Sequence, residues 1–108
     1  MFTTEERKEI ATTILMQLGG NKFKAMTGAK DILFLEDGGL RFRMPRTPFK
    51  KITHVQINYD SARDLYTIQF FRENSRQFTI TTISKHQHVY ADDLPRIFTE
   101  VTGLDTHL

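Results

Sequence analysis

The sequence predicts an α+β fold, in which an antiparallel sheet of five or six strands packs one face against an N-terminal and a C-terminal helix. Apolar residues recur at helical spacing near both ends of the chain, whereas between residues 22 and 83 the apolar period is two. The runs from residue 51 to residue 83 are short and joined by short turns, which favours an antiparallel meander. Because each helix has one apolar stripe, we expect both on the apolar face of the sheet and water on the other face.

The length of 108 residues favours a single domain over residues 1–108, large enough to fold without a metal or a disulfide. A hydrophobic content of 39% with 26% charged residues argues against disorder. The chain has no cysteine, which excludes a disulfide framework, a thiolate metal site and a Cys nucleophile. No apolar run approaches the ~20 residues that cross a bilayer, and no signal-peptide segment follows Met1. We therefore expect a cytoplasmic protein that does not bind a membrane.

The first helix is expected over residues 3–18. Thr3 and Glu6 have the spacing of a capping box, in which each side chain bonds the other residue's main-chain amide. The helix should end at Gly19-Gly20, since glycine tolerates the left-handed conformation after a helix. Its apolar stripe consists of Ile10, Ile14, Leu15 and Leu18.

Strands are expected between the two helices. The alternation in residues 22–26 predicts the first, residues 32–35 and 40–44 the next two, and Asp37-Gly38 the hairpin turn between those two. Pro45 and Pro48 then bracket a loop. Alternation in the later strands predicts that these side chains face inward: Val55, Ile57, Tyr59, Tyr66, Ile68, Phe70, Phe78 and Ile80.

The C-terminal part begins with a polar connection over residues 84–89 and continues as a helix over about residues 92–102. Asp92 is the expected N-cap, Pro95 falls in the first turn, and Gly103 follows the last turn. The expected core combines both ends of the chain with the sheet: Ile14, Leu18, Phe23, Phe42, Ile57, Ile68, Ile97, Phe98 and Val101.

Catalytic and metal-binding patterns are weak. His86 and His88, with Asp92 or Asp93, have the composition of a metal site, but two histidines in a polar loop explain them better. No serine stands in a nucleophile elbow, and the glycine pairs make no phosphate-binding loop. We therefore expect no enzyme activity, no cofactor and no metal.

The outward face of the sheet is the candidate site. Residues 22–51 hold eight basic and three acidic residues, and four of the basic ones have outward parity: Lys22, Lys24, Arg41 and Arg43. Phe71 stands among them, so cations for phosphates and a ring for a base could together bind single-stranded nucleic acid. Known sheet-based binders use two or three aromatics, and this face offers one. The alternatives are a protein-binding face and a merely solvated face.

Two segments of the chain have distinctive motifs. The first is LGGNKFKAMTGAK from residue 18, and the second runs from Tyr90-Ala91-Asp92 through Ile97-Phe98-Thr99-Glu100-Val101-Thr102-Gly103-Leu104. Together they resemble a family of small bacteriophage and mobile-element proteins. The family pairs an LGGNKFxAMTGAK-like segment with a YADxLxxIFTEVTGL-like terminus, and this chain departs from it at Pro95. The resemblance implies a phage or prophage accessory protein in the bacterial cytoplasm. It implies no activity, cofactor or catalytic residue.

Binding is therefore the expected function. We favour a host or phage protein as the partner, with a second copy of the chain as one candidate because open sheets present edges that must be covered or paired. Single-stranded nucleic acid is the alternative.

Overall fold

The computed structural model describes residues 2–45 and 47–106 of the chain. Within these residues the helices are α1 (Thr4–Leu18), α2 (Gly20–Thr27) and α3 (Leu94–Thr102), and a short 3-10 helix, η1 (Ala91–Asp93), precedes α3. The strands are β1 (Lys30–Leu35), β2 (Gly39–Arg43), β3 (His54–Asp60), β4 (Leu65–Asn74) and β5 (Thr79–Val89).

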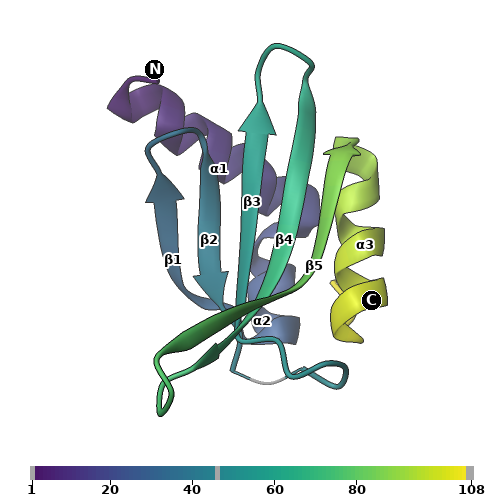
Figure 1. Ribbon diagram of the computed structural model, residues 1–108. Coiled ribbons are helices and arrows are strands. Elements are labelled where there is room, and N and C mark those ends of the chain that lie inside the picture. Colours follow the sequence, from purple (N-terminus) through teal and green to yellow (C-terminus); the bar gives the residue numbers. More distant parts are fainter. Residues whose placement is uncertain (1, 46, 107–108) are drawn as a thin grey trace.

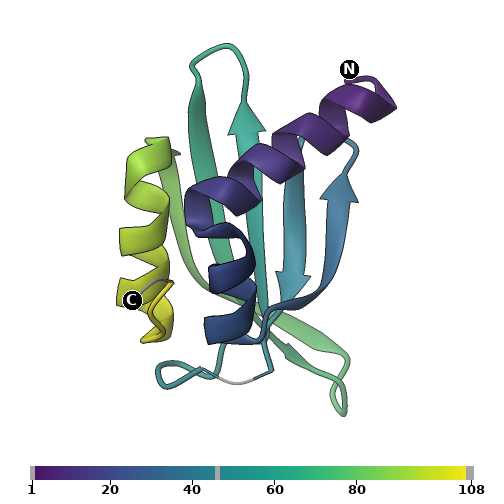
Figure 2. The same cartoon turned by 180° about the vertical axis from the view of Figure 1, so that it is seen from behind.

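The strands form one antiparallel sheet in the order β1-β2-β3-β4-β5, so each pairs with its neighbour along the chain. The helices all lie on one face, and the other face is open (Figures 1 and 2). This confirms the predicted α+β fold with terminal helices on one face, and the sheet has five strands.

The core lies between the helices and the sheet. All nine residues predicted to share it are buried and belong to one cluster. Its centre is aromatic: the Phe23 ring lies 5.5 Å from that of Phe42 and 5.2 Å from that of Phe98, between centroids, and Phe70 lies 6.4 Å from Phe98. One ring comes from each of α2, β2, β4 and α3, so this contact ties both ends of the chain to the sheet.

The start of α1 confirms the capping box. Thr3 Oγ1 accepts a hydrogen bond from the Glu6 amide at 3.1 Å, and Glu6 Oε1 accepts one from the Thr3 amide at 2.9 Å. The bond from the Thr3 amide stabilises the ionised carboxylate and lowers the pKa of Glu6. The helix ends at Gly19, whose φ of 129° suits glycine, and a Cβ there would lie 2.9 Å from the carbonyl oxygen of Thr106.

The strand predicted over residues 22–26 is wrong, because this segment is helix α2. Phe23 and Thr27, four residues apart, are its buried positions, and the Thr27 hydroxyl donates to the Phe23 carbonyl at 2.7 Å. Lysine, alanine and methionine between them are good helix formers. An alternation of polar and apolar residues over only five positions fits a strand, and it also fits a helix that buries Phe23.

Residues 84–89 are also corrected, since they belong to β5 and not to a connection. Ser84 pairs with Phe70 and His86 with Ile68, two buried residues of β4, so both polar side chains stand at the margin of the helix-covered face. A strand at the edge of the sheet tolerates polar residues on that face because the helices cover it only in part.

The inward orientation predicted for Phe78 and Ile80 is wrong as well. The pairing of β4 with β5 shifts by one residue between Phe70 and Phe71, and such a bulge moves every later side chain of one strand to the opposite face. Ile80 consequently lies opposite Glu73 and is 59% exposed, and Phe78 is 93% exposed. Residues 72–82, which we call the hairpin arm, project beyond the rest of the sheet (Figure 1).

The C-terminal helix forms as predicted except at its start. Its N-cap position is Asp93, without a side-chain capping bond, and the predicted N-cap Asp92 lies within η1. Pro95 is in the first turn, and Gly103 ends the helix with a left-handed φ of 79°.

Candidate functional site

The open face of the sheet presents two adjacent rows of polar side chains. The strand register places Arg41 of β2 beside Gln56 of β3 and Gln69 of β4. The next row consists of Arg43, His54 and Phe71. These side chains share the face because each row takes one residue per strand, and alternate residues of a strand point to the same side.

Three of the five predicted site residues come together here. The guanidinium carbon of Arg41 lies 5.8 Å from the ring centroid of Phe71, in the range of a cation–π contact, and Arg43 is in the row of Phe71. Lys22 and Lys24 are exposed residues of α2, which lies on the helix-covered side (Figure 2). Their predicted place on the open face is therefore wrong, since it depended on the incorrect strand over residues 22–26.

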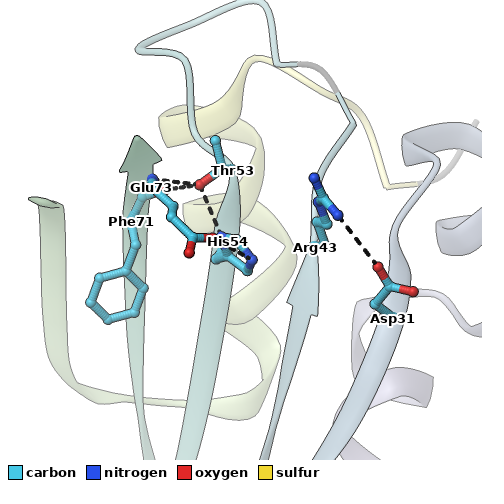
Figure 3. A network of polar contacts seen from close by, with 6 residues as sticks. All are labelled: Asp31, Arg43, Thr53, His54, Phe71 and Glu73. Carbon is cyan, nitrogen blue, oxygen red and sulfur yellow. Dashed lines mark hydrogen bonds and ion pairs between the residues drawn. The ribbon is translucent and has the colours of Figure 1, made fainter. Parts of the chain in front are cut away.

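A polar network joins the neighbouring strands around Phe71 (Figure 3). Arg43 Nη1 lies 3.9 Å from Asp31 Oδ2, and His54 Nε2 lies 3.5 Å from Glu73 Oε2. Thr53 Oγ1 is 2.9 Å from His54 Nδ1 and accepts a hydrogen bond from the Glu73 amide at 2.8 Å. Each basic group in this row thus has an acidic neighbour.

The sequence analysis did not identify His54 or its partners Asp31, Thr53 and Glu73 as part of the site. Glu73 belongs to β4 and pairs with Ile80 of β5. Asp31 lies in β1 at an irregularity, with a φ of 54°. No pattern within a single strand reveals these contacts, because each depends on the register between strands.

Burial is the main influence on His54, whose side chain is 16% exposed. Loss of solvation disfavours the imidazolium and lowers the pKa of His54, and the nearby guanidinium groups of Arg41 and Arg43 act in the same direction. The Glu73 carboxylate opposes this shift without cancelling it. The ionisation of His54 is therefore disfavoured by burial and by the two arginines, and it is favoured by Glu73.

Two shallow hollows meet at this network, with volumes of about 270 and 280 Å³. Both are lined by Arg43, His54 and Glu73. A larger hollow of about 600 Å³ lies elsewhere, between the start of α1 and the β1–β2 turn, and its lining includes Phe2, Arg7, Glu36 and Asp37. The hollows on the open face suit an extended ligand lying across the strands better than an enclosed small molecule.

The histidines considered for a metal site have other contacts. The His86 ring lies 6.1 Å from that of Phe70, between centroids, and its Nε2 is 3.3 Å from Ser84 Oγ. His88 Nε2 lies 3.2 Å from Arg63 Nη1. The described part of the chain contains no group of three or more His, Asp or Glu residues placed to hold a metal ion.

Apolar side chains are exposed at two places near this face. Phe78, 93% exposed, and Ile80, 59% exposed, belong to the hairpin arm. At the edge strand β1, Leu33, 60% exposed, lies on the open face opposite Arg41, whereas Phe34, 48% exposed, points to the helix-covered side opposite the buried Leu40. Large exposed apolar groups are common singly, but adjacent ones often mark an interaction surface.

Comparisons of the chain with protein-family models, with curated proteins and with solved structures find no match. Among the described residues, no helix has the length and apolar character needed to cross a membrane. What the molecule binds must therefore be inferred from its own surface.

Proposed function

We propose that the protein is a non-enzymatic accessory protein of a bacteriophage or prophage, and that it binds a host or phage protein in the bacterial cytoplasm. The observation that carries this proposal is Phe78, which is 93% exposed at the tip of the hairpin arm. The phage origin is supported by the resemblance of the two segments described above.

The arm has the features of a protein-binding element. Burying an aromatic side chain of this size in a partner would contribute about 1.5–3 kcal/mol. Ile80 lies two residues further on, and Arg76 lies two residues before Phe78. Aromatic residues and arginine are enriched among the residues that dominate binding energy in protein interfaces. The partner that fits this tip has an apolar pocket with acidic groups at its rim.

Single-stranded nucleic acid on the open face is the second candidate, favoured by the contact between Arg41 and Phe71. Two observations weigh against it. Asp31 and Glu73 bring negative charge beside Arg43 and His54, where a phosphate would have to bind. Lys22 and Lys24 are on α2, so they add no positive charge to this face. We therefore favour the protein partner.

The test is affinity capture from a lysate of the bacterial host, with and without nuclease. The bait proteins are the parent chain, Phe78→Ser and the matched control Tyr90→Ser, which removes another exposed aromatic outside the arm. We expect a protein that survives nuclease and is retained by the parent and by Tyr90→Ser but lost by Phe78→Ser. Equal capture by all three would contradict a role for the arm.

The nucleic-acid alternative predicts a different outcome. The captured material would then be sensitive to nuclease and lost by an Arg41→Glu/Arg43→Glu double variant, while Phe78→Ser would retain it. Binding would also weaken steeply with salt, because each neutralised phosphate releases counterions.

A further inference from the structure

β1 is an edge strand, and no other strand among the described residues pairs with its outer side. Residues 32–35 contain neither a charged residue nor proline, the residue types that commonly protect an edge from pairing, and Leu33, Phe34 and Leu35 pair regularly with β2. The α1 helix lies behind the sheet and does not run along this edge (Figures 1 and 2). The strand therefore exposes main-chain groups together with the apolar side chains of Leu33 and Phe34.

The opposite edge strand is better protected. The pairing of β5 with β4 shifts register twice, between Tyr66 and Ile68 and between Phe70 and Phe71 of β4. Bulges of this kind twist an edge away from a flat partner. The irregularity in β1 lies only at its start, between Lys30 and Leu33. Of the two edges, β1 is the one suited to pairing.

We propose that the protein forms a homodimer in which the β1 strands of two copies pair antiparallel about a twofold axis at Leu33. In this register Leu33 lies opposite Leu33 of the second copy, and Ile32 lies opposite Phe34. Every facing pair in the centre of the strand is then apolar on both sides of the sheet, which stabilises cross-strand pairs. The two five-stranded sheets join into one continuous sheet.

Charge complementarity favours a second copy over an unrelated strand. Basic Lys30 begins the strand, and acidic Glu36 follows its end. Antiparallel self-pairing at Leu33 brings each Lys30 toward Glu36 of the other copy, so opposite charges meet at both ends of the interface. A parallel arrangement would place like charges together instead. The dimer does not depend on binding by the hairpin arm, because it uses a different strand.

The chain has no cysteine, so single-cysteine variants can report the register directly. Directly opposite residues of antiparallel strands have Cα atoms about 4.5–5.5 Å apart, within the range of a disulfide. We expect Leu33→Cys to form a covalent dimer on mild oxidation. Ile32→Cys alone should not, because its copies would be diagonal neighbours about 7–8 Å apart. A mixture of Ile32→Cys and Phe34→Cys should cross-link.

The control for random collision is Met16→Cys, at a position on α1 that is 72% exposed. Light scattering provides the second measurement. The parent should have twice the chain mass of 12.6 kDa, and Leu33→Arg should have the single mass with an unchanged circular dichroism spectrum. The proposal is overturned if the parent is a monomer, if Leu33→Arg remains dimeric, or if Leu33→Cys cross-links no faster than Met16→Cys.

Discussion

The ring of Phe98 in α3 meets the ring of Phe23 in α2 edge to face, with the ring centroids 5.2 Å apart and both side chains fully buried. Phe23 belongs to the segment over residues 18–30, and Phe98 belongs to the segment over residues 90–104. Their contact therefore joins sequence features from opposite ends of the chain over the centre of the sheet.

Truncating the Phe98 side chain should strongly destabilise the fold. We expect Phe98→Ala to lower the free energy of unfolding by ~3–5 kcal/mol, because a large cavity remains in the core. Urea unfolding followed by circular dichroism measures the change. Phe78→Ala is the matched control, since its ring is 93% exposed, and it should stay within ~0.5 kcal/mol of the parent. A Phe98→Ala protein as stable as this control would contradict the core described here.

Gly39 should be the glycine least tolerant of substitution. A Cβ at this position would overlap the Ile57 carbonyl oxygen, so an alanine must push β2 away from β3. We expect Gly39→Ala to lower the free energy of unfolding by ~3 kcal/mol. Gly20→Ala is the comparison, because no atom lies within 4 Å of its added Cβ and only its φ of 62° opposes alanine. Its cost should be ~1 kcal/mol. Thermal unfolding that ranks Gly20→Ala as the worse variant would refute this close approach.

The helices at the two ends and the core were predictable from sequence because their signals are local. The capping box around Thr3 and the stripe from Leu94 to Val101 each lie within one element, and a period of 3.6 over several turns has few alternatives. The same applies to the hairpin between β1 and β2, where Gly38 has the positive φ that the predicted turn needs.

One failure, the strand predicted over residues 22–26, arose because so short an alternation also fits the helix α2. The failures within the sheet occurred where side-chain orientation depends on pairing between strands. The bulge opposite Phe70 and Phe71 reverses the side on which Ile80 lies, and nothing in the sequence of β5 alone indicates the extra residue. The candidate site on the open face was likewise predictable only in part. Alternation placed Arg41, Arg43 and Phe71 on the open face, but the acidic neighbours follow only from the register.

The Tyr59 hydroxyl should lose its proton only at an unusually high pH. Its hydroxyl donates a 2.7 Å hydrogen bond to Asp64 Oδ1, which, with partial burial and nearby negative charge, raises the pKa of Tyr59 from 10.0 to about 12. The unfolded chain loses this proton first, so stability should fall as the pH rises from 10 toward 12. Ultraviolet absorbance of the phenolate measures the titration. Asp64→Asn should lower the pKa of Tyr59, and an unchanged titration in this variant would exclude the carboxylate as the cause.

His54 should make the protein less stable in mild acid. Its pKa is lowered from 6.5 in the folded protein, mainly by burial, so the unfolded chain takes up the proton first as the pH falls. The free energy of unfolding should therefore decrease below about pH 6.5, and His54→Gln should flatten this part of the profile.

The Glu73 carboxylate acts against this shift, because its negative charge raises the pKa of His54. A variant without this charge therefore tests the contact. Glu73→Gln should lower the pKa of His54 further, as measured by NMR titration of the imidazole ring protons. A rise in the pKa of His54 in this variant would show that the contact at 3.5 Å is not attractive.

Phe78 should prove to be a residue that stability does not require. Its side chain is 93% exposed, and its φ of 54° is a conformation that costs a residue other than glycine or asparagine about 1 kcal/mol. We expect Phe78→Asn to retain the fold and to raise the free energy of unfolding by up to ~1 kcal/mol, because asparagine adopts this conformation more readily. Phe78→Val should lower it, since a β-branched side chain resists positive φ. Chemical unfolding of the parent and the two variants gives their order of stability.

If Phe78→Asn is as stable as the parent or more so, yet no longer captures the partner, the aromatic ring serves binding. If Phe78→Asn is instead the least stable of the three, the ring contributes to folding, and its exposure no longer supports the arm as an interaction surface.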